Sequence, residues 1–136
     1  MTALTDFLLA NPVNTITEDV IVSKRIKDSE GNFIKFKIKP MLNEQYLEYQ
    51  NQCIVPKKGG KIDFNTKKFN QLIILNHTVE PNFRDAQLIQ QAGCVTPEQL
   101  LNKFLLAGEI QVLSERIREI SGFADSLDEL VDEVKN

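Results

Sequence analysis

The sequence lacks most of the residue types and patterns on which catalytic and membrane functions depend. Its 136 residues include no tryptophan, a single histidine (His77) and two cysteines, Cys53 and Cys94. The cysteines form no CxxC pair and stand at no metal-ligand spacing, so we expect neither a zinc site nor a disulfide framework. No apolar run approaches the ~18 residues of a membrane span, and no signal peptide pattern opens the chain. We therefore expect a cytosolic protein with reduced thiols.

Sequence motifs for catalysis are also missing. Gly59-Gly60-Lys61 lacks the glycine spacing and the following Ser or Thr of a phosphate-binding loop. The carboxylates between Asp125 and Glu133 do not follow the calcium-loop pattern. A small enzyme whose site assembles only in space stays open as an alternative; a deep pocket around His77, or a carboxylate with a strongly shifted pKa, would reveal it. We expect no catalytic residues, no cofactor and no metal.

The composition is that of one folded domain, with 42% hydrophobic and 26% charged residues. The net charge of −3 argues against a nucleic-acid partner. The charge is uneven: residues 1–68 hold 11 basic and 8 acidic side chains, whereas residues 69–136 hold 5 and 11. Two differently charged solvated faces explain this asymmetry, and head-to-tail self-association into a homo-oligomer is the alternative.

The first 40 residues combine a short helix with a β-hairpin. Thr2 can cap a helix over residues 2–10, which must dock either on its own domain or on another protein because so short a helix is marginal alone. Residues 15–39 alternate apolar and polar side chains around turn residues 28–32, where Gly31 allows a positive φ. The basic residues of this hairpin protect an exposed strand edge or aid solubility; meeting an acidic protein and, as the weakest alternative, binding a nucleic acid stay open.

The next segment, residues 41–122, reads as a helical core. We expect helices over residues 42–54 and from Asn65 or Thr66 to about His77, separated by a flexible loop over residues 56–61. A short helix follows over 84–91. Thr96-Pro97-Glu98-Gln99 then supplies an N-cap, a proline at N1 and a capping-box partner. After a tight joint at Ala107-Gly108, an apolar seam recurs at helical spacing: Ile110, Leu113, Ile117 and Ile120.

The last segment, residues 123–136, is predicted to be an amphipathic acidic helix. Its apolar side chains share one face and are surrounded by carboxylates. Taken together, residues 1–136 form a single α+β domain, with a small N-terminal antiparallel sheet followed by a mostly helical remainder.

Several motifs resemble the XkdN-like family of phage tail assembly chaperones. They are VIVSKRIKDSEGNFIKFKIKP near the N-terminus, then TVEPNFRDA, LLNKFLLAGEI and EISGF, followed by a short acidic tail. The resemblance covers nearly the whole chain and implies a non-enzymatic factor in building a contractile-type phage or prophage tail. It implies that the chain binds the aggregation-prone, largely helical tape measure protein and keeps it soluble. A structural tail component retained in the particle is the alternative.

The resemblance also implies that a longer, frameshifted form of the same protein is made. No active site is carried over from the family, and neither nucleic acid nor membrane is expected as a partner. The proposed protein-interaction residues are the apolar side chains of the two terminal segments: Leu4, Phe7, Leu8, Leu127, Leu130, Val131 and Val134.

Overall fold

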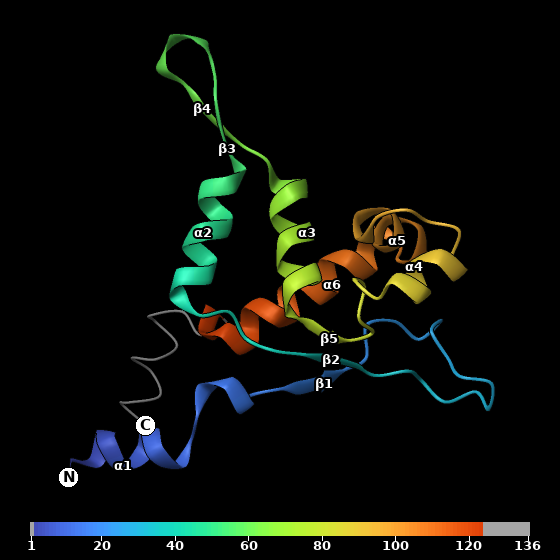
Figure 1. The fold of residues 1–136 in the computed structure, drawn as a ribbon, viewed down its shortest axis with the longest axis horizontal. Coiled ribbons are helices and arrows are strands. Elements are labelled where there is room, and N and C mark those ends of the chain that lie inside the picture. Colours follow the sequence, from blue (N-terminus) through green and yellow to red (C-terminus); the bar gives the residue numbers. More distant parts are fainter. Residues whose placement is uncertain (1, 124–136) are drawn as a thin grey trace.

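The computed structural model describes residues 2–123, which form an α+β fold as predicted (Figure 1). Six α-helices are present in this range: α1 (Ala3–Ala10), α2 (Asn43–Cys53), α3 (Thr66–His77), α4 (Ala86–Gln91), α5 (Pro97–Phe104) and α6 (Ala107–Arg118). The strands of the same range are β1 (Glu18–Val20), β2 (Phe36–Ile38), β3 (Ile54–Pro56), β4 (Ile62–Phe64) and β5 (Thr78–Glu80). Short 3₁₀ turns span Val13–Thr15 and Lys58–Gly60, and a π-helical turn, Glu119–Phe123, follows α6. The predicted acidic helix of residues 123–136 lies, beyond Phe123, outside the described residues.

The main sheet has the strand order β1-β2-β5, with antiparallel pairing on both sides of β2. β1 pairs with β2 in the register Glu18↔Ile38, and β5 pairs with it through Ile38↔Thr78. The strand β5 was not predicted, because residues 79–82 were interpreted only as a turn. Its presence corrects the edge interpretation of the lysines, since Lys37 lies on the central strand and not on an edge.

The predicted N-terminal hairpin is confirmed, including its turn. Gly31 adopts φ 84°, and the Asp28 N–H donates to the Asn32 carbonyl at 2.9 Å. The two arms are unequal, however. Between the β1–β2 ladder and the Lys27↔Phe33 bridge, the first arm contains residues 21–26 and the second only residues 34–35. The surplus residues of the first arm leave the ladder and cross toward the helices.

The core lies between this sheet and the helices, with α3 against α2, α5 and α6. Ile73 and Ile74 of α3 are fully buried, as are Leu113 and Ile117 of α6. The seam predicted over residues 110–120 is therefore a core face, with Ile110 and Ile120 only partly buried at its ends. Burial of several such aliphatic side chains, each worth about 1.5–3 kcal/mol, stabilises the helix pair.

The start of α5 follows the predicted capping pattern with one difference. Thr96 Oγ1 accepts from the Gln99 N–H at 3.1 Å, and Pro97 occupies N1. The Gln99 side chain, however, accepts from the N–H of Val95 at 2.8 Å, one residue before the cap. The joint to α6 is also displaced: α5 ends at Phe104, and Ala107 already begins α6.

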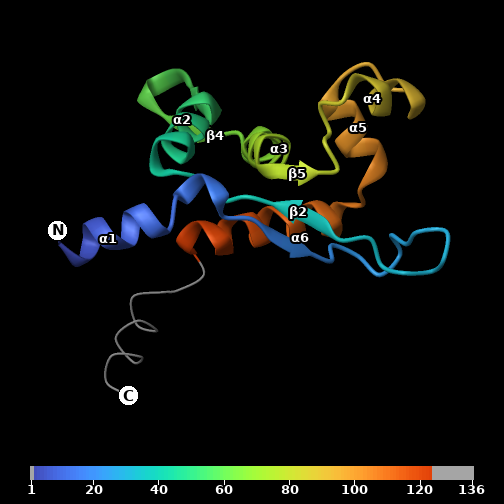
Figure 2. The ribbon, with the colours of Figure 1, turned by 60° about the horizontal axis from the view of Figure 1, so that its bottom comes forward.

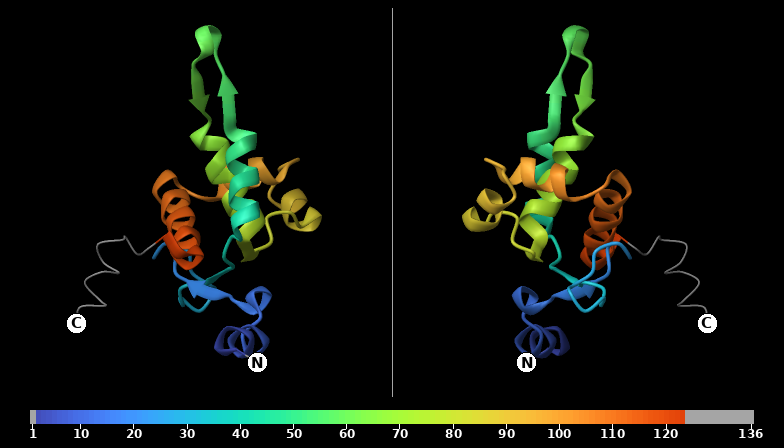
Figure 3. Two further views of the ribbon diagram at one scale, coloured as in Figure 1. Left: turned by 90° about the vertical axis from the view of Figure 1, so that its left-hand side faces the viewer. Right: turned by 90° about the vertical axis from the view of Figure 1, so that its right-hand side faces the viewer.

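The predicted loop over residues 56–61 is instead the tip of a second β-hairpin, β3–β4. Its strands pair in the register Ile54↔Phe64 and Pro56↔Ile62. It extends beyond the ends of α2 and α3 (Figures 1 and 3). Pro56 fits there because a two-stranded ribbon consists of edge strands, where a missing N–H is tolerated. At the opposite side of the molecule from this hairpin (Figures 1 and 3), α1 projects from the end of the main sheet (Figure 2).

Candidate interaction surface

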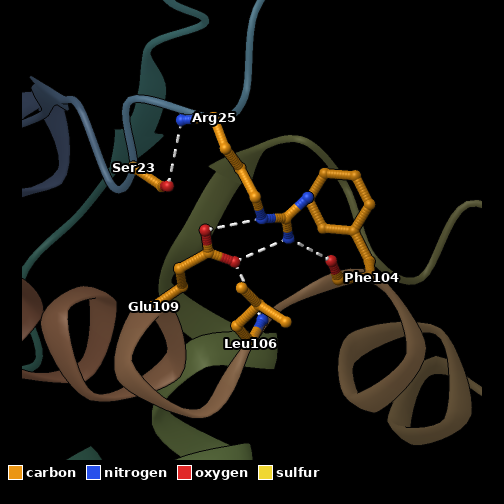
Figure 4. A network of polar contacts seen from close by, with 5 residues as sticks. All are labelled: Ser23, Arg25, Phe104, Leu106 and Glu109. Carbon is orange, nitrogen blue, oxygen red and sulfur yellow. Dashed lines mark hydrogen bonds and ion pairs between the residues drawn. The ribbon is translucent and has the colours of Figure 1, made fainter.

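Glu109, at the start of α6, is the centre of a network of hydrogen bonds (Figure 4). Its Oε2 accepts from Arg25 Nε at 2.8 Å and its Oε1 from Arg25 Nη2 at 2.6 Å, while Oε1 also accepts from the Leu106 N–H at 2.8 Å. Arg25 Nη2 donates further to the Phe104 carbonyl at 2.7 Å. The Arg25 hydrogen bonds lower the pKa of Glu109 to about 2, although burial of the carboxylate opposes this shift.

Arg25 reaches Glu109 because it lies in the surplus residues of the first hairpin arm. The network therefore connects the edge of the main sheet to the joint between α5 and α6. Both carboxylate oxygens are occupied by these donors, so the strongly shifted pKa of Glu109 has a structural explanation.

His77 is buried at the end of α3. Its Nε2 lies 2.8 Å from the Tyr49 hydroxyl, and the two rings meet edge to face with centroids 5.6 Å apart. Burial, with a smaller contribution from the charge of Lys39, lowers the pKa of His77 to about 4. A cavity of about 660 Å³ on the surface of α3 and α5 is lined by other residues, Lys67, Gln71 and Lys103 among them. His77 thus acts as a neutral member of the core.

The described residues contain no group of three side chains suited to hold a metal ion. Within the same range, no helix is both long enough and apolar enough to cross a membrane.

Two groups of exposed apolar side chains lie on the projecting elements, α1 and the β3–β4 hairpin. In α1, Thr2 caps the helix by accepting from the Thr5 N–H at 3.1 Å, and no residue of the helix is buried. Leu4, Phe7 and Leu8, spaced i, i+3 and i+4 on one face, are 66%, 58% and 51% exposed. α1 therefore does not dock on the described part of its own domain, and docking on another protein stays a prediction.

The β3–β4 hairpin is the second projecting element, and sequence reasoning missed it. Ile62 is 73% exposed, and Ile54, Val55 and Phe64 are about 40% exposed. The sequence offered only a weak signal: Ile62-Asp63-Phe64 alternates after Gly59-Gly60, whereas residues 54–56 before it do not alternate. Each arm has only three paired residues, too few for a period of two to stand out.

Comparison with known proteins identifies the family to which this chain belongs. The family model for the phage XkdN-like tail assembly chaperone protein matches residues 4–135. This chain belongs to the phage XkdN-like tail assembly chaperone family. Members of the family act in building a phage tail, which is a non-enzymatic role, and this points to phage tail proteins as partners.

Two relatives of this tail assembly chaperone come from Bacillus subtilis strain 168. The phage-like element PBSX protein XkdN is 32% identical over 133 residues, covering 92% of this chain and 90% of the relative. The protein YqbN is 29% identical over 138 residues, covering 98% and 93%. The crystal structure of YqbN matches with a TM-score of 0.63 at 25% identity, over 85% of this chain and 94% of that one. The resemblance deduced from the motifs is therefore confirmed.

The predicted interaction residues divide into two groups. Leu4, Phe7 and Leu8 lie together on the exposed face of α1. The other four lie outside the described residues: Leu127, Leu130, Val131 and Val134.

Proposed function

We propose that this tail assembly chaperone binds the tape measure protein encoded beside it and keeps that protein soluble until tail tube subunits polymerise around it. The observation that supports the proposal is the projecting helix α1, which Thr2 caps and whose apolar face is exposed in the described part of the chain. Such a face fits the helix-in-groove mode of recognition, in which residues at i, i+3 and i+4 enter an apolar groove. The largely helical tape measure protein would supply that groove.

The size of the α1 face suits a partner that must later be released. Full burial of a Leu or Phe side chain contributes about 1.5–3 kcal/mol. In Leu4, Phe7 and Leu8, half or more of the surface of each residue is still exposed. Covering them thus contributes about 3–5 kcal/mol before the costs of association. Contacts of this strength bind weakly one by one and exchange readily. In this proposal the apolar residues of the acidic segment add to the surface: Leu127, Leu130, Val131 and Val134.

The test is co-expression with the tape measure protein from the same gene cluster. The soluble fraction of the tape measure protein and its capture by the tagged chaperone are both measured. We expect capture and increased solubility with the natural chain, and loss of both with Phe7→Ser combined with Leu8→Ser. Because no residue of α1 is buried, the free energy of unfolding of this variant should stay within about 0.5 kcal/mol of the natural chain's.

The matched control is Val95→Ser, which removes an equally apolar side chain that is 83% exposed between α4 and α5. Capture should be unchanged in this variant. If the natural chain captures nothing and is found in purified tail particles, it is a retained structural component and the proposal is wrong.

A further inference from the structure

One face of the β3–β4 hairpin is apolar and uncovered in the described part of the chain. Side chains alternate across a two-stranded ribbon, so cross-strand partners and every second residue share a face. The residues sharing this face are Ile54, Pro56, Ile62 and Phe64. A two-stranded hairpin alone is marginally stable in water, so a cover over this face would stabilise it.

A row of aromatic rings leads from this face to the last described residue. The Phe64 ring meets the Phe69 ring edge to face at 5.2 Å between centroids, and Phe69 meets Tyr46 at 5.7 Å. Tyr46 in turn lies 4.9 Å from Phe123, which is 54% exposed. Residues 124–136 therefore begin at one end of an aromatic row whose other end is the apolar face of the hairpin.

The charges at the hairpin tip complement those of the segment that follows Phe123. Lys57 pairs with Asp63 at 2.9 Å, whereas Lys58 and Lys61 form no ion pair among residues 2–123. The segment after Phe123 carries five carboxylates within nine residues: Asp125, Asp128, Glu129, Asp132 and Glu133. Four apolar residues stand among these carboxylates or directly after them: Leu127, Leu130, Val131 and Val134.

We propose that residues 125–134 of the same chain cover the aromatic row and the apolar face of the β3–β4 hairpin, with their carboxylates toward Lys58 and Lys61. Three successive ring contacts of 4.9–5.7 Å lead from Phe123 to Phe64. A segment with the length of residues 124–134 spans about 16 Å as a helix or about 36 Å when extended, so it is long enough to follow this row of rings. The same apolar residues become available for a tail protein when the segment leaves the hairpin. The contact does not depend on which tail protein the chain binds.

The absence of tryptophan makes a direct test possible. Ile62→Trp places a single tryptophan on the exposed part of the face in the full-length chain. We expect its emission to be blue-shifted and protected from acrylamide. A second full-length chain adds Leu127→Ser, Leu130→Ser, Val131→Ser and Val134→Ser, and there the emission should shift to the red with faster quenching. The control places the tryptophan at Val95, where the four serines should change nothing.

The charge contribution is tested in the same Ile62→Trp chain. Lys58→Glu with Lys61→Glu should expose the tryptophan, and so should raising the ionic strength from about 0.15 M to about 1 M, which shortens the Debye length from about 8 to about 3 Å. Each exposed ion pair changes the equilibrium of the contact by at most about fivefold, so the two reversals together should weaken the contact by roughly tenfold. Lys24→Glu with Lys35→Glu, on the other hairpin, is the matched control.

Identical emission with and without the four serines would overturn the proposal. Protection that disappears on dilution would also overturn it, because the occupant would then be the segment of a second copy. No tail protein is present in this assay, so its outcome is separate from that of the capture experiment.

Discussion

Replacing Glu109 by Gln tests the connection between the N-terminal hairpin and the α5–α6 joint. Gln keeps one oxygen for the Leu106 N–H, but it places an amide NH₂ where Oε2 accepts from Arg25 Nε at 2.8 Å. Two donors then face each other, and the guanidinium loses its counter-charge. The pair contains two charge-assisted hydrogen bonds around a carboxylate that is only 8% exposed.

The expected cost is about 2 kcal/mol. Hydrogen bonds to charged groups contribute about 1.5–3 kcal/mol, and the 45% exposure of the Arg25 side chain places this pair in the lower part of that range. For a chain of this length, a loss of about 2 kcal/mol lowers Tm by roughly 6–10 °C.

The assay is a double-mutant cycle in urea, with Arg25→Met as the second change because it keeps the aliphatic stem. We expect a coupling energy of about 1.5 kcal/mol at pH 7. Since the pKa of Glu109 is lowered to about 2, this stabilisation is complete above about pH 4.5 and is lost as the pH falls toward 2.

The control cycle uses Arg116 and Glu119, an exposed i, i+3 pair 3.1 Å apart that should couple by less than about 0.5 kcal/mol. If the Arg25–Glu109 cycle gives a value as small as this control, the network does not hold the hairpin to the helices and the reasoning is refuted.

Two further predictions concern stability. His77 is neutral in the folded and the unfolded chain above about pH 6.5, but between that value and about pH 4 only the unfolded chain takes up a proton on this side chain. The free energy of unfolding should therefore fall by about 2–3 kcal/mol between pH 6.5 and 4.5. Urea titrations across this range should show this dependence on pH, and His77→Gln should abolish it. Gly31→Ala should lower the free energy of unfolding by about 1 kcal/mol, because φ is 84° at this position. Gly108→Ala should raise it by about 0.5 kcal/mol, since Gly108 is helical and an added Cβ meets no atom within 4 Å. Denaturant titrations that give both changes the same sign would contradict these two predictions.

Helix signals were read correctly where near neighbours in sequence decide the outcome. The Thr96-Pro97 start of α5 and the turn at Gly31 depend on backbone groups within a few residues. The apolar seam of α6 follows from helical spacing alone, with Leu113 and Ile117 at its centre. The family motifs likewise belong to the linear order of residues.

Short strands were read poorly, because their partners lie far away in the chain. Three residues of β5 carry no period of two, and they become a strand only because Ile38 lies beside Thr78. The same distance hides the ion pair between Arg25 and Glu109, which are separated by 84 residues. Edge protection by Lys37 was a wrong expectation for this reason, since whether a strand is central depends on what pairs with its other side.

The sequence by itself determined the α+β class, the start of α5, the turn of the first hairpin and membership of the tail assembly chaperone family. The tertiary structure decided which apolar faces are covered. The stripe of α6 and the stripe of α1 share the same kind of spacing, yet Leu113 is buried and Leu4 is 66% exposed. Periodicity shows that a face is apolar, but its burial depends on whether the rest of the chain lies against it, and only the three-dimensional arrangement contains that information.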